Sequence, residues 1–273
     1  MDAGRIAGVE WGLPPAQSVE MDVQAYLQRV RYSPEVDRPN AGLLRGLHRA
    51  HLFTVPFENL DIRMKREIVC DEARILHKIV NQHRGGFCYE LNGASTALLR
   101  ALGFEVTLLS ARVAKDDGTF GPEFDHLTLR VDLEEPWLAD VGFGDCFLDP
   151  LRLEFGAEQP QGDRAYRLSS RRASGDSVID LEVMADGKWK KEYAFTLQPR
   201  ELQDFSEMCR YHQTSPKSHF TGQRICSMAT AEGRVTLADE KLIETSRGVR
   251  QEKLLSGEQE WRSTLRDLFG VVL

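Results

Sequence analysis

RGGFCYELNG (residues 84–93) places a cysteine just behind two glycines, at the point where a helix is predicted to begin. Gly85 and Gly86 permit backbone angles that other residues avoid, so they predict a sharp turn between two helices. Cys88 then falls in the first turn of the second helix, where unpaired N–H groups carry partial positive charge. That field favours a thiolate and predicts a lowered pKa for Cys88, whereas a cysteine that only packs in the core needs no such position.

The sequence around this stretch has a helical pattern. Apolar residues at helical spacing predict four helices, over 21–32, 41–55, 71–83 and 89–103. Asp71 is the expected N-cap of the third helix, and Gly103 is expected to close the fourth. The first hundred residues are therefore predicted to be mostly helical.

The middle of the chain changes to alternating, β-rich sequence. Strands are predicted over 104–113, 126–133, 137–144, 166–172, 177–184 and 191–197. From about Leu202 the pattern mixes short helix and strand, and it finishes with a helix over 258–270. Helices first, strands next and a mixed end predict an α+β fold, with an antiparallel sheet or barrel in the middle.

A nucleophilic cysteine needs an imidazole partner, which an acid or amide orients in turn. His126 opens a predicted strand whose apolar residues alternate onto the opposite, core-facing side. Asp140 interrupts the next predicted strand just before Gly142, and two strands joined by a tight turn are neighbours. Separately, His126 can be read as a surface residue and Asp140 as a strand-end residue. The order Cys88, His126, Asp140 favours a catalytic triad.

Five strings of the sequence together resemble the arylamine N-acetyltransferase family. They occur in that family's order: VPFENL (55–60), RGGFCYELN (84–92), HLTLRV (126–131), DVGFG (140–144) and TSPKSHF (214–220). The spacings of 38 residues from Cys88 to His126 and 14 from His126 to Asp140 are also similar. The resemblance extends from about Met21 to the end of the sequence.

The resemblance implies three domains around a papain-like catalytic core. A helical domain over 21–103 would carry Cys88, a β-barrel domain over 104–203 would carry His126 and Asp140, and an α/β lid would follow over 204–273. Residues 1–20 have neither periodicity nor a motif, and they are expected to form a flexible extension.

The resemblance also implies the chemistry. Acetyl-CoA would be the co-substrate, with no permanently bound cofactor, and arylamines, arylhydrazines and arylhydroxylamines the acceptors, as in xenobiotic metabolism. By motif match, the triad is Cys88, His126 and Asp140, and the acceptor pocket is lined by Phe57, Val113 and Phe143. The expected CoA contacts are Gly121, Pro122, Glu123, Phe124, Tyr211 and Lys217. The resemblance also implies that Glu58 and Arg84 form a structural ion pair, and removing one partner would leave the other charge unpaired at a cost of about 3–5 kcal/mol.

The composition of the chain argues against several other classes of protein. A net charge of −7 argues against general nucleic-acid binding, which needs a basic surface. Five widely spaced cysteines without a C-x-x-C pattern, and seven histidines without H-E-x-x-H, give no support to a disulfide framework or a metal site. No apolar run approaches the roughly 20 residues of a membrane helix, and no secretory signal is present, so a cytoplasmic location is expected.

Two other enzyme activities use the same residues. An amide synthase that releases or cyclises a polyketide belongs to the same family. A cysteine hydrolase or a transglutaminase-like enzyme uses the same triad and differs in its acceptor. The sequence alone does not choose the physiological amine or the oligomeric state.

Overall fold

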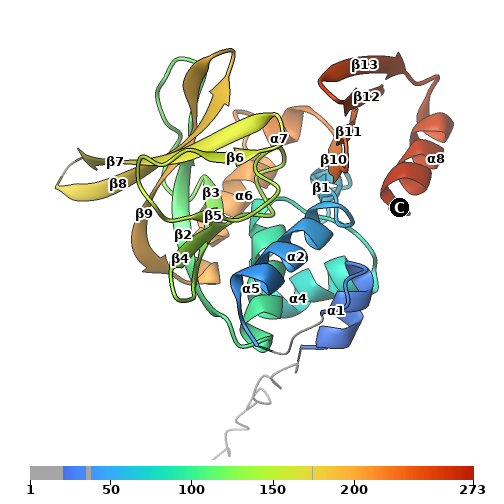
Figure 1. Ribbon diagram of the computed structural model, residues 1–273. Helices are drawn as coiled ribbons and strands as arrows, with labels where there is room; N and C mark the ends of the chain where they lie inside the picture. The colour runs from blue at the N-terminus through green and yellow to red at the C-terminus, as the bar shows by residue number, and fades with distance from the viewer. Residues whose placement is uncertain (1–20, 35–37, 174) are drawn as a thin grey trace, which may run out of the picture.

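The chain runs from helices through a long antiparallel sheet to a mixed C-terminal part. The structure is a computed structural model that describes residues 21–34, 38–173 and 175–273, so the extension predicted over 1–20 lies outside the described residues. The blue and cyan helices gather beside the green and yellow strands, and the red elements extend away from both (Figure 1). This arrangement confirms the predicted α+β class, whereas the domain boundaries stay a prediction.

The first part contains α1 (Val23–Arg29), α2 (Ala41–Leu52), α3 (Leu60–Arg63), α4 (Glu72–Leu76) and α5 (Cys88–Ala101). The side chains of Asp22, Asn40 and Asp71 each accept a hydrogen bond from a backbone N–H three residues later, which begins α1, α2 and α4. The predicted N-cap at Asp71 is therefore confirmed. After α4 the helix widens into a π-helical turn over His77–Asn81, and this turn buries Lys78.

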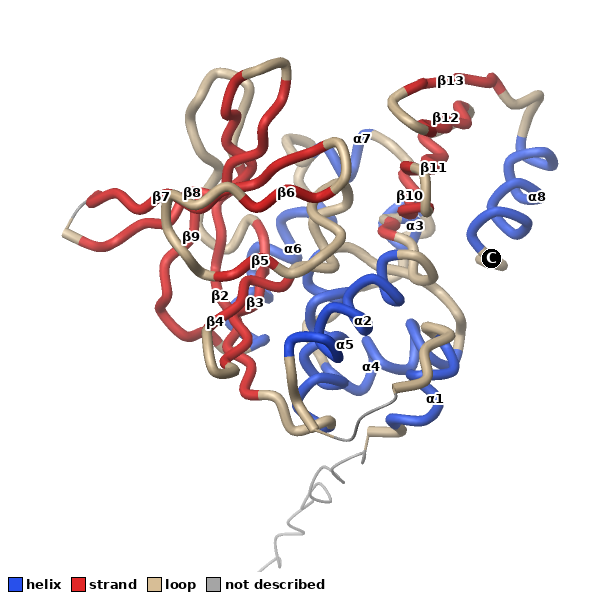
Figure 2. The backbone as a smooth tube through the Cα atoms, viewed as in Figure 1, coloured by secondary structure: helices blue, strands red, loops and turns tan. Residues whose placement is uncertain are grey.

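The central sheet has eight antiparallel strands in the order β5-β4-β3-β2-β9-β8-β7-β6. They are β2 (Glu105–Val113), β3 (His126–Asp132), β4 (Pro136–Ala139), β5 (Leu151–Arg152), β6 (Gln159–Gln161), β7 (Arg164–Ala173), β8 (Asp176–Ala185) and β9 (Lys188–Arg200). The two edges lie next to each other, because the side-chain amide of Gln159 in β6 exchanges hydrogen bonds of 2.8 and 3.0 Å with the backbone of Arg152 in β5. The sheet is thus a nearly closed barrel, and its strands β2–β9 are among those drawn in red in Figure 2.

A second sheet joins the helical part to the C-terminal part. It has the order β1-β10-β11-β12-β13, with β1 (Phe57–Glu58), β10 (Ile225–Thr230), β11 (Gly233–Ala238), β12 (Lys241–Ser246) and β13 (Val249–Leu254). The side chain of Asn59 reinforces this joint, because it donates to the carbonyls of Phe220 and Gln223 and accepts from the N–H of Ile225. The VPFENL motif therefore holds the C-terminal part against the helices.

The remaining elements are a 3-10 helix (Leu202–Phe205), α6 (Ser206–Thr214), α7 (His219–Gly222) and α8 (Glu258–Phe269). The helix α8 packs on the second sheet through Trp261, Leu265 and Phe269, all buried. Among the described residues, no helix is long and apolar enough to cross a membrane. The same residues include no cluster of three or more histidine, cysteine or acidic side chains arranged to hold a metal ion.

Strand β3 is buried on both of its faces. Leu127, Leu129 and Val131 pack into the core that they share with α5, as their alternation predicts. Burying each of these side chains stabilises the fold by about 1.5–3 kcal/mol. His126 and Thr128 point to the other side but are also buried, because that side faces the barrel interior and not solvent. The interpretation of His126 as a surface residue is therefore wrong.

Candidate active site

The turn before Cys88 is shaped by the absence of two side chains. A Cβ on Gly85 would lie 1.9 Å from the carbonyl oxygen of Pro56, and one on Gly86 would lie 2.6 Å from the Cβ of Glu90. Neither glycine is among the described residues with positive φ, so the prediction of unusual backbone angles is wrong. Glycine is required at both positions because Pro56 and Glu90 approach the backbone so closely. The second helix begins at Cys88, one residue before the predicted range of 89–103, so Cys88 does lie in its first turn as predicted.

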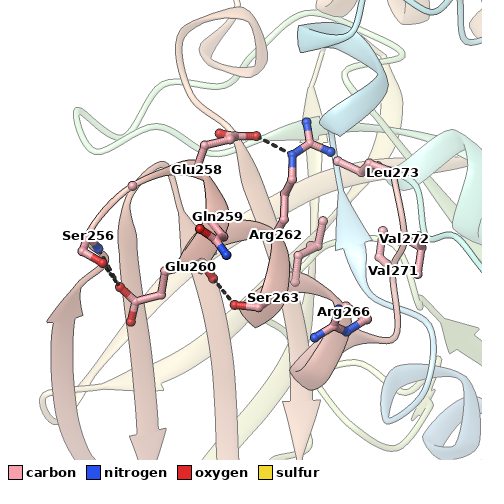
Figure 3. Close-up of a pocket in the computed structure, with 12 residues that line it drawn as sticks. Ser256, Glu258, Gln259, Glu260, Arg262, Ser263, Arg266, Val271, Val272 and Leu273 are labelled. Carbon is pink, nitrogen blue, oxygen red and sulfur yellow. Dashed lines mark hydrogen bonds and ion pairs between the residues drawn. The ribbon is translucent and has the colours of Figure 1, made fainter.

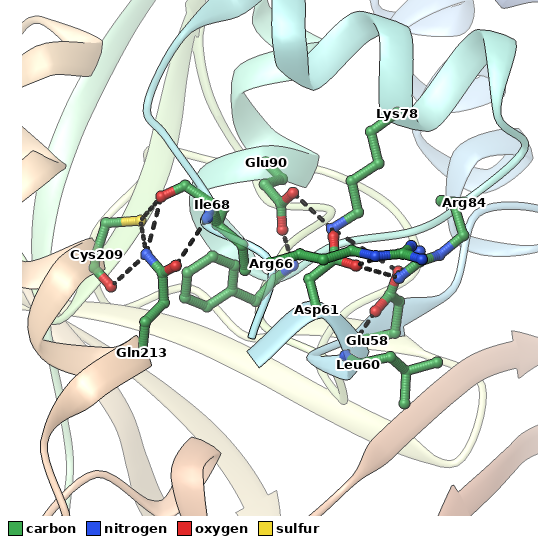
Figure 4. Close-up of polar contacts among 11 residues, drawn as sticks. Glu58, Leu60, Asp61, Arg66, Ile68, Lys78, Arg84, Glu90, Cys209 and Gln213 are labelled. Atoms are coloured by element: carbon green, nitrogen blue, oxygen red, sulfur yellow. Dashed lines mark hydrogen bonds and ion pairs between the residues drawn. The ribbon is translucent and has the colours of Figure 1, made fainter. Parts of the chain in front are cut away.

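A buried ionic network stands behind this turn (Figure 4). Arg84 donates to Glu58 at 2.7 Å and to Asp61 at 3.1 Å, and Lys78 lies 2.7 Å from both Asp61 and Glu90. Glu58 and Arg84 are thus in contact, but sequence reasoning missed the other three members of the network. The three carboxylates face two buried cations, Lys78 and Arg84, and the exposed Arg66 lies 4.0 Å from Asp61. Burial raises the pKa of Glu90 to about 7; the nearby charges of Glu58 and Asp61 add to this rise, and the charge of Lys78 opposes it.

Glu90 also fixes the start of α5. Its second carboxylate oxygen accepts a hydrogen bond of 3.1 Å from the backbone N–H of Phe87, in the manner of a capping box. The helix that begins at Cys88 is therefore tied to the buried network through one side chain. No simple sequence pattern identifies this link, because Lys78 belongs to the π-helical turn.

His126 and Asp140 meet inside the protein. The Nε2 of His126 lies 2.6 Å from Oδ2 of Asp140, with the two residues 2% and 1% exposed. Strand β3 begins at His126, and Asp140 follows the last residue of β4, so the neighbouring strands bring the two side chains to one end of the barrel. Because Nε2 faces the carboxylate, Nδ1 is the ring nitrogen left for proton exchange.

Sequence reasoning missed the residues that hold Asp140. Asn92 donates 2.9 Å to Oδ1 of Asp140 and accepts a hydrogen bond from the N–H of Val141. The N–H of Gly142 donates 3.0 Å to the same Oδ1, and the N–H of Asp140 donates 3.1 Å to Nε2 of His48. The sequence could have identified Asn92 as a site residue, because it follows Cys88 by one helical turn in the RGGFCYELN string. His48 lies on α2, and no motif of the sequence links it to Asp140.

Gly142 brings the end of β4 against the start of α5. A Cβ on Gly142 would lie 2.7 Å from Nδ2 of Asn92 and 2.8 Å from Cα of Cys88. Cys88 and His126 line one pocket of about 630 Å³ together with Gly142. The three elements α5, β3 and β4 therefore converge on a single cavity.

The three residues expected around an acceptor line this pocket. Phe57, Val113 and Phe143 come from β1, β2 and the loop after β4. The ring of Phe143 stands edge-on to His126, with 5.1 Å between ring centroids, and lies 5.1 Å from the ring of Tyr193. An aromatic wall of this kind suits a flat aromatic ligand.

The six residues expected near CoA separate into two groups. Those that line the pocket are Gly121, Pro122, Tyr211 and Lys217. Glu123 is exposed and is not among the lining residues. Phe124 packs its ring against Phe205, with 5.3 Å between centroids, and lies under the guanidinium of Arg200. Phe124 therefore has a packing role that its motif position did not indicate.

The pKa of Cys88 shifts in the direction opposite to the prediction. Burial raises the pKa of the Cys88 thiol well above its ordinary value, and the charges of Asp140 and Asp125 raise it further. The lowered pKa expected from the helix start is therefore wrong for the thiol by itself, because loss of solvation outweighs the field of the helix. A thiolate here needs a cation beside it, and the imidazole of His126 in the same pocket can supply one by taking the thiol proton.

The carboxyl group of Asp140 is held in its ionised form. Burial by itself would raise its pKa, but the charge of His126 and hydrogen bonds from His126, Asn92 and Gly142 keep that pKa below its ordinary value. The site thus combines a thiol and an imidazole that line one pocket with a buried carboxylate that lies behind the imidazole. This arrangement can form and break an acyl thioester.

A larger hollow of about 930 Å³ lies elsewhere, between α8 and the C-terminal residues (Figure 3). Its polar lining consists of serine, glutamine, glutamate and arginine side chains, including an ion pair between Arg262 and Glu258. Its described lining includes neither a cysteine nor a histidine. The candidate reactive residues Cys88 and His126 therefore line the smaller pocket and not this one.

Comparison with known proteins agrees with this geometry. Residues 42–273 match the family model described as N-acetyltransferase. The arylamine N-acetyltransferase pineal gland isozyme NAT-3 of Gallus gallus is 31% identical, over 93% of this chain and 95% of that protein. Arylamine N-acetyltransferase 1 of Homo sapiens is 30% identical, over 78% and 79%.

Solved structures are similar over the same length. The arylamine N-acetyltransferase of M. tuberculosis superposes with a TM-score of 0.84 at 31% identity, covering 92% of this chain and 94% of that one. The Mycobacterium marinum enzyme in complex with CoA gives a TM-score of 0.83 at 32% identity, covering 92% and 93%. The helical part, the barrel and the C-terminal sheet are therefore all included in the similarity.

Proposed function

The chain belongs to the arylamine N-acetyltransferase family, and on that premise we propose that it transfers acetyl groups from acetyl-CoA to arylamines and arylhydrazines, and to the oxygen of arylhydroxylamines, through acetyl-Cys88. The observation that supports this proposal most directly is the buried contact between His126 and Asp140 in the pocket that Cys88 lines. Membership of the family makes acetyl-CoA the co-substrate, in keeping with the M. marinum relative whose structure contains CoA.

The first half-reaction loads the cysteine. The thiol proton of Cys88 moves to Nδ1 of His126, and the thiolate sulfur attacks the carbonyl carbon of acetyl-CoA. Backbone N–H groups in the first turn of α5 are suited to stabilise the oxyanion that forms. The bond between that carbon and the CoA sulfur then breaks, and CoA leaves with the proton from His126. Asp140 stabilises the imidazolium throughout.

The second half-reaction transfers the acetyl group. The acceptor nitrogen attacks the carbonyl carbon of acetyl-Cys88, and His126 takes the proton that the nitrogen loses. The carbon–sulfur bond breaks and restores the Cys88 thiolate beside the imidazolium. Because CoA has already left, the two substrates can use overlapping parts of one pocket, which fits the ping-pong order.

The walls of the pocket suggest where each substrate binds. Phe57, Val113 and Phe143 would hold the aromatic ring of the acceptor, since two of them are aromatic and all three line the cavity. Gly121, Pro122, Tyr211 and Lys217 would contact CoA, with Lys217 supplying a positive charge for its phosphates. Glu123 and Phe124 have less support, because neither lines the cavity.

The decisive experiment uses the full chain and acetyl-CoA without an acceptor. Mass spectrometry of the digested protein should find one acetyl group, on the peptide that contains Cys88, and the Cys88→Ala variant should acquire none there. Acetylation of a different cysteine, or of none, would contradict the proposal.

A second measurement identifies the acceptor. Adding a panel of arylamines and arylhydrazines to the acetylated protein should release the acetyl group and restore the free thiol. Release that is equally fast without any amine would instead indicate a hydrolase. If the protein transfers no acetyl group to these amines but joins the acyl group of a polyketide to an amine of the same molecule, it is an amide synthase.

A further inference from the structure

A second imidazole–carboxylate pair lines the same pocket. His212 on α6 has its Nε2 3.2 Å from Oδ1 of Asp125, the residue that directly precedes His126. Both residues line the cavity with Cys88, and their side chains are only 5% and 16% exposed. The mechanism described above uses neither of them.

The contact has the distance of an ion pair but lacks hydrogen-bond geometry. Among the described residues, Nε2 of His212 is buried and has no partner in hydrogen-bond geometry, although the Asp125 carboxylate is within ion-pair distance. A neutral ring gains little from such a contact, whereas an imidazolium gains the full attraction of a nearby anion in a partly buried site.

The other ring nitrogen can accommodate a proton. Nδ1 of His212 lies 3.2 Å from the hydroxyl oxygen of Ser218, which also accepts a hydrogen bond of 3.3 Å from the N–H of Phe220. A hydroxyl can donate to a neutral ring nitrogen or accept from a protonated one. His212 can therefore carry a positive charge without leaving Nδ1 unsatisfied.

Asp125 is held where its charge affects the cysteine. Its carboxylate lies against Gly121, because a Cβ there would be 2.1 Å from Oδ2. Its carbonyl oxygen accepts a hydrogen bond of 3.3 Å from the hydroxyl of Tyr89, the neighbour of Cys88 on α5. From this position the negative charge of Asp125 raises the pKa of Cys88.

We propose that His212, as an imidazolium, compensates the charge of Asp125 and so favours the thiolate of Cys88. His212 is then a positioning residue that acts through Asp125, and His126 remains the base. This inference rests on the proposed function, in which the thiolate of Cys88 is the nucleophile.

The titratable and charged groups that face His212 or line its side of the pocket are Asp125 before β3, Tyr89 on α5, Tyr211 on α6, and Lys217 and His219 next to and within α7. Burial, together with the charge of His212, lowers the pKa of His219 below its ordinary value, so that ring stays neutral at neutral pH. Asp125 is the acidic member of this described set, which makes it the natural counterion of His212.

The test is the pH dependence of Cys88 alkylation by iodoacetamide, followed by mass spectrometry of the Cys88 peptide in the full chain. His212→Gln keeps a side chain that donates to Asp125 but carries no charge. We expect its alkylation midpoint to move upward by about half a unit to one unit, so that the rate below the midpoint falls about three- to tenfold. Asp125→Asn should move the midpoint downward, and the double variant should lie well below His212→Gln.

A purely structural role for His212 would lower the melting temperature without moving the alkylation profile. An unshifted midpoint in a folded His212→Gln protein, or equal midpoints for this variant and the double variant, would overturn the proposal. If His212→Gln does not fold, an unchanged midpoint in Asp125→Asn overturns it equally. Alkylation needs neither acetyl-CoA nor an amine, so its outcome is separate from the acetylation of wild-type Cys88 that tests the proposed function.

Discussion

His126 and Asp140 lie 2.6 Å apart although their positions are not opposite each other in the sheet. Strands β3 and β4 pair Leu129 with Ala139, so Asp140 follows the last paired residue and His126 lies further along its strand. The chain leaves β4 after Ala139 and turns at Gly142 towards Cys88, which carries the carboxylate diagonally to the imidazole. The contact therefore forms where the pairing of β3 and β4 ends, and not between two residues that are paired in the sheet.

Asp140→Asn should reduce acetyl transfer by about 10²–10⁴-fold while the protein stays folded. Oδ1 of Asp140 accepts from both Asn92 and Gly142, so an asparagine would keep its oxygen there and turn its NH₂ group towards Nε2 of His126. The ring would then carry its proton on Nδ1 and could not accept one from Cys88. Alkylation of Cys88 by iodoacetamide at neutral pH should slow in parallel.

Asp132→Asn is the matched control for that variant. Asp132 also pairs with a cation on β3, at 2.6 Å from Arg130, but it lies at the opposite end of the strand and is partly exposed. Its loss should leave both transfer and alkylation near wild type. If Asp140→Asn is folded and alkylates and turns over like Asp132→Asn, Asp140 is not the third member of the triad.

Gly142→Ala should impair both stability and activity. The added Cβ would meet Cα of Cys88 at 2.8 Å and its carbonyl oxygen at 3.0 Å, so the end of β4 or the start of α5 must move. Crowding of this kind costs about 1–3 kcal/mol and displaces Asp140 from His126. Thermal unfolding and the rate of acetyl transfer measure the two effects, and Gly222→Ala, where a Cβ meets nothing within 4 Å, is the control. Equal behaviour of the two variants would contradict the close approach.

Phe143→Ser should change which acceptors are preferred. Its ring borders the pocket and stands 5.1 Å from that of His126, so removing it opens space for bulky acceptors and weakens the packing of slim ones. Relative rates across a series of arylamines are the measurement. Acetylation of Cys88 by acetyl-CoA should change less. Phe155→Ser, at an exposed position outside the pocket, serves as the control, and an acceptor profile that both variants share with wild type would count against the assignment.

Glu90 should make stability depend on pH near neutrality. Burial raises its pKa from 4.5 to about 7 in the folded protein, so the fold favours the neutral carboxyl. This contribution is complete below the unfolded pKa and is lost as the pH rises through the folded one. Relative to Glu90→Gln, wild-type protein should therefore lose roughly 3 kcal/mol of unfolding free energy between pH 4.5 and pH 7.5.

Denaturant unfolding at a series of pH values measures that difference. Glu154→Gln, which alters an exposed carboxyl, should follow wild type at every pH. If the gap between wild type and Glu90→Gln stays constant with pH, then Glu90 does not titrate in this range and the prediction is wrong.

The predicted elements follow from local rules. The apolar spacing before and after Asp71, and the alternation of Leu127, Leu129 and Val131, report directly on the faces that are buried. The motif strings predict that Cys88, His126 and Asp140 act together for a similar reason, because residue types and their order can be read directly from the sequence. The packing of Phe124 on Phe205 was not predictable, since it depends on a partner far away in sequence.

The α+β order, the helix whose first turn contains Cys88, and the family all follow from the amino-acid sequence. The electrostatics depend on the folded structure: burial reverses the direction predicted for the pKa of Cys88, and the contact between His212 and Asp125 brings together residues 87 positions apart. The physical reason is that periodicity and capping act within a few residues, whereas desolvation and Coulomb interactions depend on which distant groups fold around a site.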